Sequence, residues 1–176
     1  MASFANFLGF QAVWFACVLG AARGAPWIGP VAALVFGVAC LERGRRARSA
    51  AALTVVALLG AALDALLIAT RALGYPHDDG RAPELLAPPW IVALWFAFAA
   101  TFRLSMRWLG GRIVLQIALG LLGSPLSYLG AERLGAVRIG EDRFLSLAVL
   151  GGAWAVVFPL TFALERRIRG PSEPPR

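Results

Sequence analysis

The residue in this chain best placed to do chemistry is Asp64, an acid inside the apolar stretch of residues 50–70. About 20 apolar residues in a helix cross the hydrocarbon layer of roughly 30 Å, so this stretch is long enough to span a bilayer. An ionisable side chain there costs about 2.5–3.5 kcal/mol on insertion scales. Asp64 should therefore face protein or water and have a partner. Helical spacing places Ala57, Gly60 and Arg71 close to the same face.

Two interpretations of Asp64 stay open. In the functional one, its carboxylate relays an ion or proton, or contacts a substrate or a lipid headgroup. In the structural one, it is a buried acid tied to Arg71, Gln116, Tyr128 or an amide of the first apolar stretch. Arg71 lies two helical turns away, about 10 Å along the axis, so an ion pair would require Arg71 to reach back.

Three amide side chains lie in apolar stretches: Asn6 and Gln11 in the first, and Gln116 in the fifth. Amides in hydrocarbon usually hold helices together, by about 0.6–2 kcal/mol each, and we predict this role here. The sharper hypothesis is that they line a small polar cavity with Asp64. The predicted binding residues are accordingly Asp64, Gln116, Tyr128, Asn6, Gln11 and Arg71.

The fifth apolar stretch has a face of small and polar residues, Gln116, Gly120, Gly123 and Ser127, against which a neighbouring helix can pack closely. Within it, Pro125 removes one backbone hydrogen bond, and we predict a helix kink there. Kinked helices often line the sites of transporters, although plain packing is the simpler explanation.

The composition indicates an integral membrane protein. Of 176 residues, 59% are hydrophobic and 15% are charged, with a mean hydropathy of +0.71, whereas soluble domains hold about 25% charged residues. The net charge is +7, and all 17 basic residues are arginine. Because these arginines lie between apolar stretches, they are typical of topology signals, and we predict no nucleic-acid partner.

We predict an all-α fold, an integral membrane bundle of six transmembrane helices at residues 4–22, 26–41, 50–70, 89–109, 113–130 and 144–164. Residues 1–169 form one domain, and residues 170–176 form a disordered cytoplasmic tail. Eleven arginines fall on one side of this topology and six on the other. The excess places both termini in the cytoplasm.

Three tryptophans near predicted helix ends, Trp27, Trp90 and Trp108, are expected to be interfacial anchors. A weak self-match at an offset of 81 residues, with residues 11–16 resembling 92–97, is compatible with an inverted repeat or with chance. His77, Asp78 and Asp79 are too few for a metal site, so a solvated loop is expected. We predict no metal and no cofactor.

Several short motifs resemble a bacterial family of small inner-membrane proteins classified only as a domain of unknown function, DUF2878: Asn6-Phe7, Gln11, Trp14-Phe15, Asp64, Pro89-Trp90, Leu94-Trp95-Phe96, Ser105, Trp108-Leu109, Pro125-Leu126-Ser127-Tyr128, Gly130 and Leu134-Gly135-Ala136. The resemblance implies that Asn6, Gln11, Asp64, Trp95, Pro125 and Tyr128 are the positions to watch. Ser124 stands where a glycine is expected. Family genes tend to neighbour lipid-modifying enzymes, which implies a link to envelope lipid chemistry.

Three functions stay open for this multi-pass protein of a bacterial inner membrane. The first is a transporter-like or small-ligand-binding module with a polar site around Asp64. The second is an accessory or catalytic component of membrane-lipid modification, and the third is a structural partner of another membrane protein. Familiar hydrolytic and metal motifs are absent from the sequence, which favours a non-enzymatic role. The predicted partners are the bilayer, and a small polar ligand or a lipid headgroup.

Overall fold

The computed structural model describes residues 2–42, 44–75 and 86–170. Within them the chain forms six α-helices: α1 (Ala2–Ala22), α2 (Ile28–Ala39), α3 (Arg46–Ala69), α4 (Pro89–Ala99), α5 (Ile113–Arg133) and α6 (Arg143–Arg169). The remaining regular elements are the 3-10 helix η1 (Arg107–Leu109) and two short antiparallel strands, β1 (Leu73–Gly74) and β2 (Arg138–Ile139). The predicted all-α class is confirmed.

Four of these helices, α1, α3, α5 and α6, are long and apolar enough to cross a membrane. The other two, α2 and α4, have 12 and 11 residues, which is about 18 and 16 Å of helix and less than the hydrocarbon thickness. The structure is thus that of a membrane protein in which four of the six helices have the length of a membrane span.

The helix predicted over residues 89–109 is wrong in its second half, because α4 ends at Ala99. The chain then runs through turns whose polar groups bond to distant residues. Asn6 of α1 donates to the carbonyl of Ala100 at 3.4 Å and accepts from the Ser105 hydroxyl at 2.7 Å. The Thr101 hydroxyl also donates to the Phe98 carbonyl at 2.6 Å. The backbone N–H groups of Ala100, Thr101 and Phe102 bond to carbonyls three residues earlier, as in tight turns and not as in a continued α-helix.

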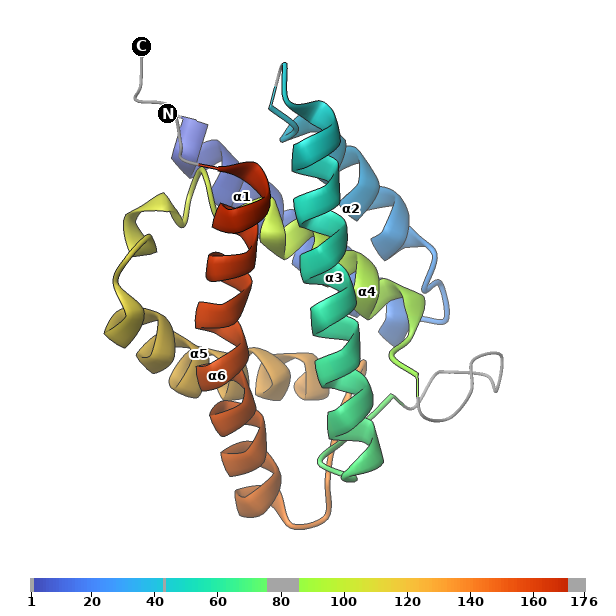
Figure 1. Ribbon diagram of the computed structural model, residues 1–176. Coiled ribbons are helices and arrows are strands. Elements are labelled where there is room, and N and C mark those ends of the chain that lie inside the picture. Colours follow the sequence, from blue (N-terminus) through green and yellow to red (C-terminus); the bar gives the residue numbers. More distant parts are fainter. Residues whose placement is uncertain (1, 43, 76–85, 171–176) are drawn as a thin grey trace.

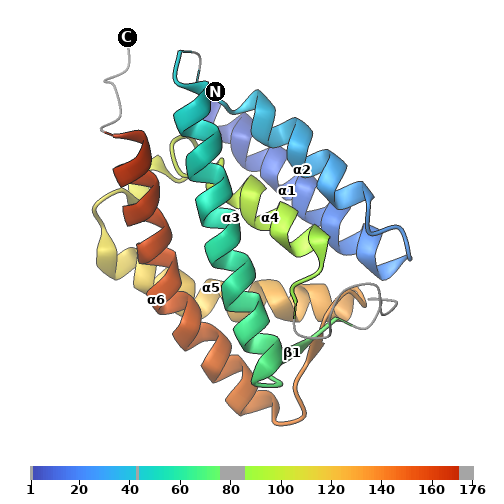
Figure 2. The same cartoon turned by 45° about the vertical axis from the view of Figure 1, so that its right-hand side comes forward.

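The helices are arranged around a shared centre (Figures 1 and 2). Helices α3 and α6 run beside one another, and the antiparallel pair α1 and α2 lies behind them. Helix α5 packs on α6 and crosses it steeply. The beginning of α1 and the end of α6 lie at the same end of the molecule.

Two glycines allow the backbones of α5 and α6 to touch where they cross. A Cβ atom on Gly120 would lie 2.5 Å from the carbonyl oxygen of Trp154, and one on Gly151 would lie 2.6 Å from that of Leu121. Glycine is needed at both positions because no side chain fits between the two backbones. Gly120 belongs to the small-residue face that the sequence predicts for helix packing.

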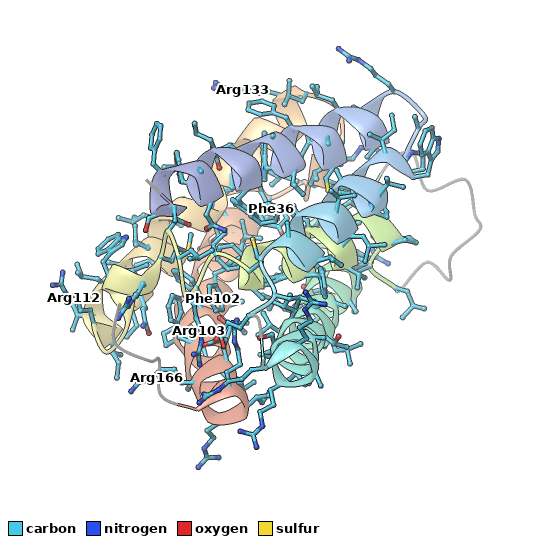
Figure 3. The ribbon with its side chains drawn as sticks, turned by 90° about the horizontal axis from the view of Figure 1, so that it is seen from above. Phe36, Phe102, Arg103, Arg112, Arg133 and Arg166 are labelled. Carbon is cyan, nitrogen blue, oxygen red and sulfur yellow. The ribbon has the colours of Figure 1, made fainter. Side chains whose placement is uncertain are left out.

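A partly buried network of charges joins three segments at the end of α6. Arg103 contacts Glu165 at 2.6 Å, Arg169 contacts Glu42 at 2.8 Å, and Arg169 also contacts Glu165 at 3.3 Å. Figure 3 shows Arg103 near Arg166 and Phe102, and far from Arg133. The arginine-rich segments assigned to one side of the membrane therefore lie together in the fold.

The helix lengths do not repeat at the offset suggested by the weak self-match. An offset of 81 residues carries α3 onto residues 127–150, which include the end of α5, strand β2 and the beginning of α6. The halves also differ in the position of their short helix, which is second in the first half and first in the second. The self-match is therefore not a repeat of helices in register.

Candidate functional site

Asp64 lies in the middle of the helix bundle and is fully buried. Its Oδ1 atom accepts hydrogen bonds from the hydroxyls of Tyr75 and Tyr128, each at 2.7 Å, and its Oδ2 atom accepts one from the indole Nε1 of Trp95, also at 2.7 Å. The acid comes from α3, Trp95 from α4 and Tyr128 from α5, while Tyr75 follows β1. One carboxylate thereby connects four separate segments.

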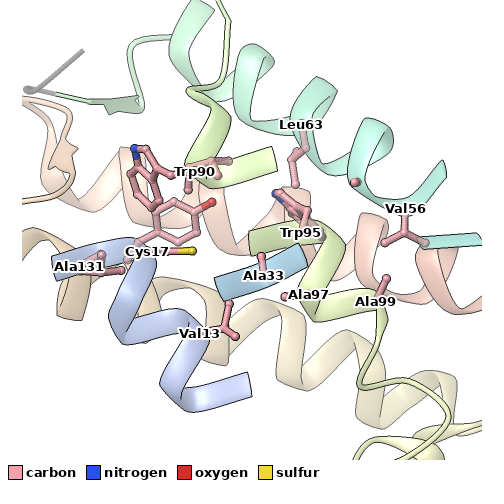
Figure 4. Packing of buried hydrophobic residues seen from close by; sticks show 14 of the residues in the cluster. Val13, Cys17, Ala33, Val56, Leu63, Trp90, Trp95, Ala97, Ala99 and Ala131 are labelled. Atoms are coloured by element: carbon pink, nitrogen blue, oxygen red, sulfur yellow. The ribbon is translucent and has the colours of Figure 1, made fainter. Parts of the chain in front are cut away.

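Trp95 is positioned by small and aromatic neighbours. Its indole lies directly against Gly60, one helical turn before Asp64, where a side chain would leave no room for the ring. Its other face stacks on Trp154 of α6, with ring centroids 4.3 Å apart and 17° between the planes. Figure 4 shows Trp95 beside Leu63 of α3. The glycine thus allows the indole to approach α3 and reach the acid.

Tyr75 is held by the short β-sheet and by a ring contact. Leu73 pairs with Ile139 in the sheet, and the Tyr75 ring meets Trp90 edge to face, with centroids 5.5 Å apart. Burial, together with the negative charge of Asp64, raises the pKa of Tyr75 well above its usual value. The hydroxyl consequently stays protonated and donates to Asp64.

The surroundings of Asp64 suit a carboxylate that only accepts hydrogen bonds. In the part of the chain that the structure describes, no arginine forms an ion pair with it. Three donors at 2.7 Å offset the cost of removing the acid from water, since bonds to a charged group are stronger than neutral ones. Asp64 therefore stabilises the positions of two tyrosines and a tryptophan.

The fit between Gly60 and Trp95 leads to a prediction about Gly60→Ala. Alanine favours a helix over glycine by about 1 kcal/mol, but the new methyl group would displace the indole from Asp64 and from Trp154. We expect a net loss of about 1–3 kcal/mol of unfolding free energy, with loss of the circular dichroism signal of the stacked indoles. The control is Gly152→Ala, where a Cβ meets open space. Equal stability of the two variants would contradict this packing.

A cavity of about 510 Å³ lies next to this network, between α1, α4, α5 and α6. Trp95 and Tyr128 form part of its wall, whereas Asp64 lies behind them and does not reach it. Most of the lining is aromatic or aliphatic. Besides the indoles of its tryptophans, its polar side chains are Gln11, Ser124, Ser127 and Tyr128.

A hydrogen bond joins α1 and α5 in the wall of the cavity: the indole Nε1 of Trp14 donates to the Ser127 hydroxyl at 3.2 Å. Phe15 and Leu126, which also line the cavity, are 48% and 69% exposed. Both residues belong to helices of membrane length. The apolar rim of the cavity therefore faces the side of the bundle that lipid would cover.

The other predicted binding residues are separated from Asp64. Gln116 donates to the Leu109 carbonyl at 2.8 Å and holds η1 onto α5, and Asn6 bonds to the turns after α4. Arg71 is exposed and has a left-handed backbone, with φ of 57°. None of these three residues hydrogen-bonds to Asp64 or lines the cavity beside it in the described structure. Gln11 lies in the cavity wall instead.

Two of the three predicted interfacial tryptophans are exposed, Trp27 at 67% and Trp108 at 54%. The assignment of Trp90 as an anchor needs correction, because it is 4% exposed and packs on Tyr75. Helix α5 continues through Pro125 to Arg133, so this proline does not end the helix. Its predicted kink stays a prediction. His77, Asp78 and Asp79 lie outside the described residues.

The sequence reasoning missed Tyr75 as a partner of Asp64. The sequence signal for it was the count of tyrosines: the chain contains two, so Tyr75 is the other candidate beside Tyr128. Trp154 was also not included in the site. Trp154 lies three residues after Gly151 in the sixth apolar stretch, and this spacing places both residues on the same face of a helix.

A family model described as a protein of unknown function, DUF2878, matches residues 3–160. The chain belongs to this family. The part that matches the DUF2878 model includes Asp64 and its three donors, and it ends before Glu165 and the arginines that follow it. No curated protein and no solved structure matches the chain.

Proposed function

We propose that this DUF2878 protein binds a small, mainly apolar molecule in the cavity between α1, α4, α5 and α6. The volume of about 510 Å³ lies within the range of roughly 300–1,000 Å³ that is usual for small-molecule sites. The observation that carries the proposal is that the buried acid fixes two residues of the cavity wall, Trp95 and Tyr128, by hydrogen bonds of 2.7 Å. Because these wall residues are already ordered, binding costs less conformational entropy.

In this proposal Asp64 is a positioning residue. It is fully buried behind the two side chains that it orients, and it does not line the cavity. The polar site expected around Asp64 is thereby replaced by an aromatic site with a polar edge. That edge includes the side-chain amide of Gln11 and the hydroxyl of Ser127.

The lining defines the chemistry of the ligand. A flat or branched apolar body fits against Trp95, Trp154 and Phe98. A single polar group of the ligand fits the amide of Gln11 and the hydroxyl of Ser127 at the polar edge. The exposed apolar rim at Phe15 and Leu126 supports entry from the bilayer. We therefore expect a lipid-soluble molecule with one carbonyl or hydroxyl group. The same lateral opening favours membrane-lipid modification as the second candidate function.

The membrane placement is part of the proposal. We propose a bacterial inner membrane, six membrane segments and both termini in the cytoplasm. The grouping of the arginine-rich segments at the end of α6 supports this orientation. The short helices α2 and α4 would enter the bilayer only partly, or cross it where it is locally thin.

Two glycines provide a matched test of the cavity. Gly123 lines it, Gly152 does not, and a Cβ on either residue meets no atom within 4 Å. We expect Gly123→Phe to fill the cavity and Gly152→Phe to leave it open. The proteins would be purified in detergent, and co-purifying molecules would be identified by mass spectrometry.

The expected result is one lipid-soluble molecule enriched in the wild type and in Gly152→Phe, and reduced about tenfold or more in Gly123→Phe, a difference of roughly 1.4 kcal/mol in binding. Unfolding temperatures would show that both variants are folded. Equal enrichment in the two variants, or no molecule enriched over bulk phospholipid in any of the three proteins, would overturn the proposal.

A further inference from the structure

A second cavity lies at the end of α6, apart from the aromatic one. It is a cleft of about 790 Å³ whose lining includes four arginines, Arg103, Arg107, Arg166 and Arg167, and one acid, Glu165. The formal charge of this lining is therefore +3. Figure 3 shows Arg103 and Arg166 near one another at this end of the molecule.

The acid in the cleft is already neutralised by the protein. Glu165 is 2% exposed and bonds to Arg103 at 2.6 Å and to Arg169 at 3.3 Å. Arg103 in turn donates to Glu42 at 3.4 Å and to the Gly170 carbonyl at 2.6 Å. Because these bonds occupy the guanidinium of Arg103, this residue has a structural role in the wall of the cleft.

The other three arginines, unlike Arg103, are not engaged with acids of the described structure. Arg107, Arg166 and Arg167 are exposed, and none of them forms an ion pair with another described residue. They surround a floor in which the Phe102 and Phe162 rings stack, with centroids 4.2 Å apart. The cleft therefore combines unneutralised guanidinium groups with an apolar base.

We propose that this cleft binds a phosphate-bearing anion. Guanidinium groups match phosphate oxygens with paired, charge-assisted hydrogen bonds. The cleft lies where the apolar helix α6 ends in Arg166 and Arg167, which is the depth of headgroup phosphates in a bilayer. A phospholipid headgroup and a free phosphate compound carry the same recognisable group, and the test below separates them.

The site is independent of the proposed aromatic cavity, because the two cavities share no lining residue. A blocked aromatic cavity in Gly123→Phe should leave anion binding unchanged. Failure of one proposal therefore does not imply failure of the other.

The test compares two sets of three arginines. Arg107, Arg166 and Arg167 would be changed to Gln together, and the control would change Arg46, Arg48 and Arg112, which are also exposed and do not line the cleft. Both sets remove three positive charges from the predicted cytoplasmic side. Binding would be measured by native mass spectrometry in a neutral detergent, with phosphatidylglycerol, phosphatidylcholine or inorganic phosphate added.

We expect phosphatidylglycerol to bind the wild type and the control more tightly than phosphatidylcholine does. The cleft variant should bind phosphatidylglycerol about tenfold or more weakly, with an unchanged unfolding temperature. Binding of inorganic phosphate with the same arginine dependence would assign the site to free phosphate compounds. An equal loss in both variants, or no loss in the cleft variant, would overturn the proposal.

Discussion

Asp64→Leu is expected to lower the unfolding free energy of the protein by about 3–6 kcal/mol. Leucine has a similar size but accepts no hydrogen bond, so the hydroxyls of Tyr75 and Tyr128 and the indole of Trp95 would all lose their acceptor in the bundle interior. Each unsatisfied buried donor costs about 1–3 kcal/mol. Among the described residues, the buried amides Gln116 and Asn6 offer no replacement, because both bond elsewhere.

Graded variants separate this effect from simple loss of packing. Asp64→Asn keeps the shape and one acceptor oxygen, and we expect an intermediate loss. Tyr128→Phe removes one donor and leaves two on the carboxylate, so its loss should be the smallest. Reversible unfolding in mixed detergent, followed by tryptophan fluorescence, gives the three values. A leucine variant as stable as the wild type would show that the three donors do not depend on the acid.

The second large effect is expected at the crossing of α5 and α6, from Gly151→Ala. The added methyl group would lie 2.6 Å from the carbonyl oxygen of Leu121. Backbone atoms cannot rotate away as a side chain does, so the two helices must separate. We expect a loss of about 2–4 kcal/mol, which overlaps the upper part of the usual overpacking range of roughly 1–3 kcal/mol and extends above it, and a similar loss for Gly120→Ala.

The neighbouring residue supplies the control for this prediction. Gly152 lies one position further along α6, and a Cβ there meets no atom within 4 Å. Gly152→Ala should be neutral or more stable by up to about 1 kcal/mol through helix propensity. Urea or detergent unfolding of the two variants is the measurement. If both variants show the same change in stability, the helices do not cross with their backbones in contact.

Hydrophobic patterning predicted the helices of this protein better than it predicted their ends. Helices α3, α5 and α6 lie where long apolar stretches indicate them, since an apolar stretch has few alternatives to a helix in hydrocarbon. The end of α4 at Ala99 was not predictable in this way. It depends on Asn6, whose bonds to Ala100 and Ser105 join residues more than 90 positions apart.

The candidate site could likewise be predicted from the sequence only in part. A buried acid with a hydroxyl partner follows from Asp64 and Tyr128 in apolar stretches, and the structure joins these two residues. The contribution of Tyr75 depends on a two-residue strand pairing that carries no hydrophobic pattern. Likewise, the arginines counted as topology signals include Arg103 and Arg169, which form ion pairs with acids inside the fold.

The separation in sequence between Asp64 and its donors has a consequence for biosynthesis. Trp95 follows the acid by 31 residues and Tyr128 by 64, so a ribosome completes α3 well before either donor has been made. Of the three donors only Tyr75, 11 residues after the acid, is made close to α3. The nascent helix would then enter the lipid phase before its carboxylate has the other two donors, and the cost of up to about 2.5–3.5 kcal/mol must be outweighed by its leucines and valines. Stable integration of α3 should accordingly wait for the arrival of α5.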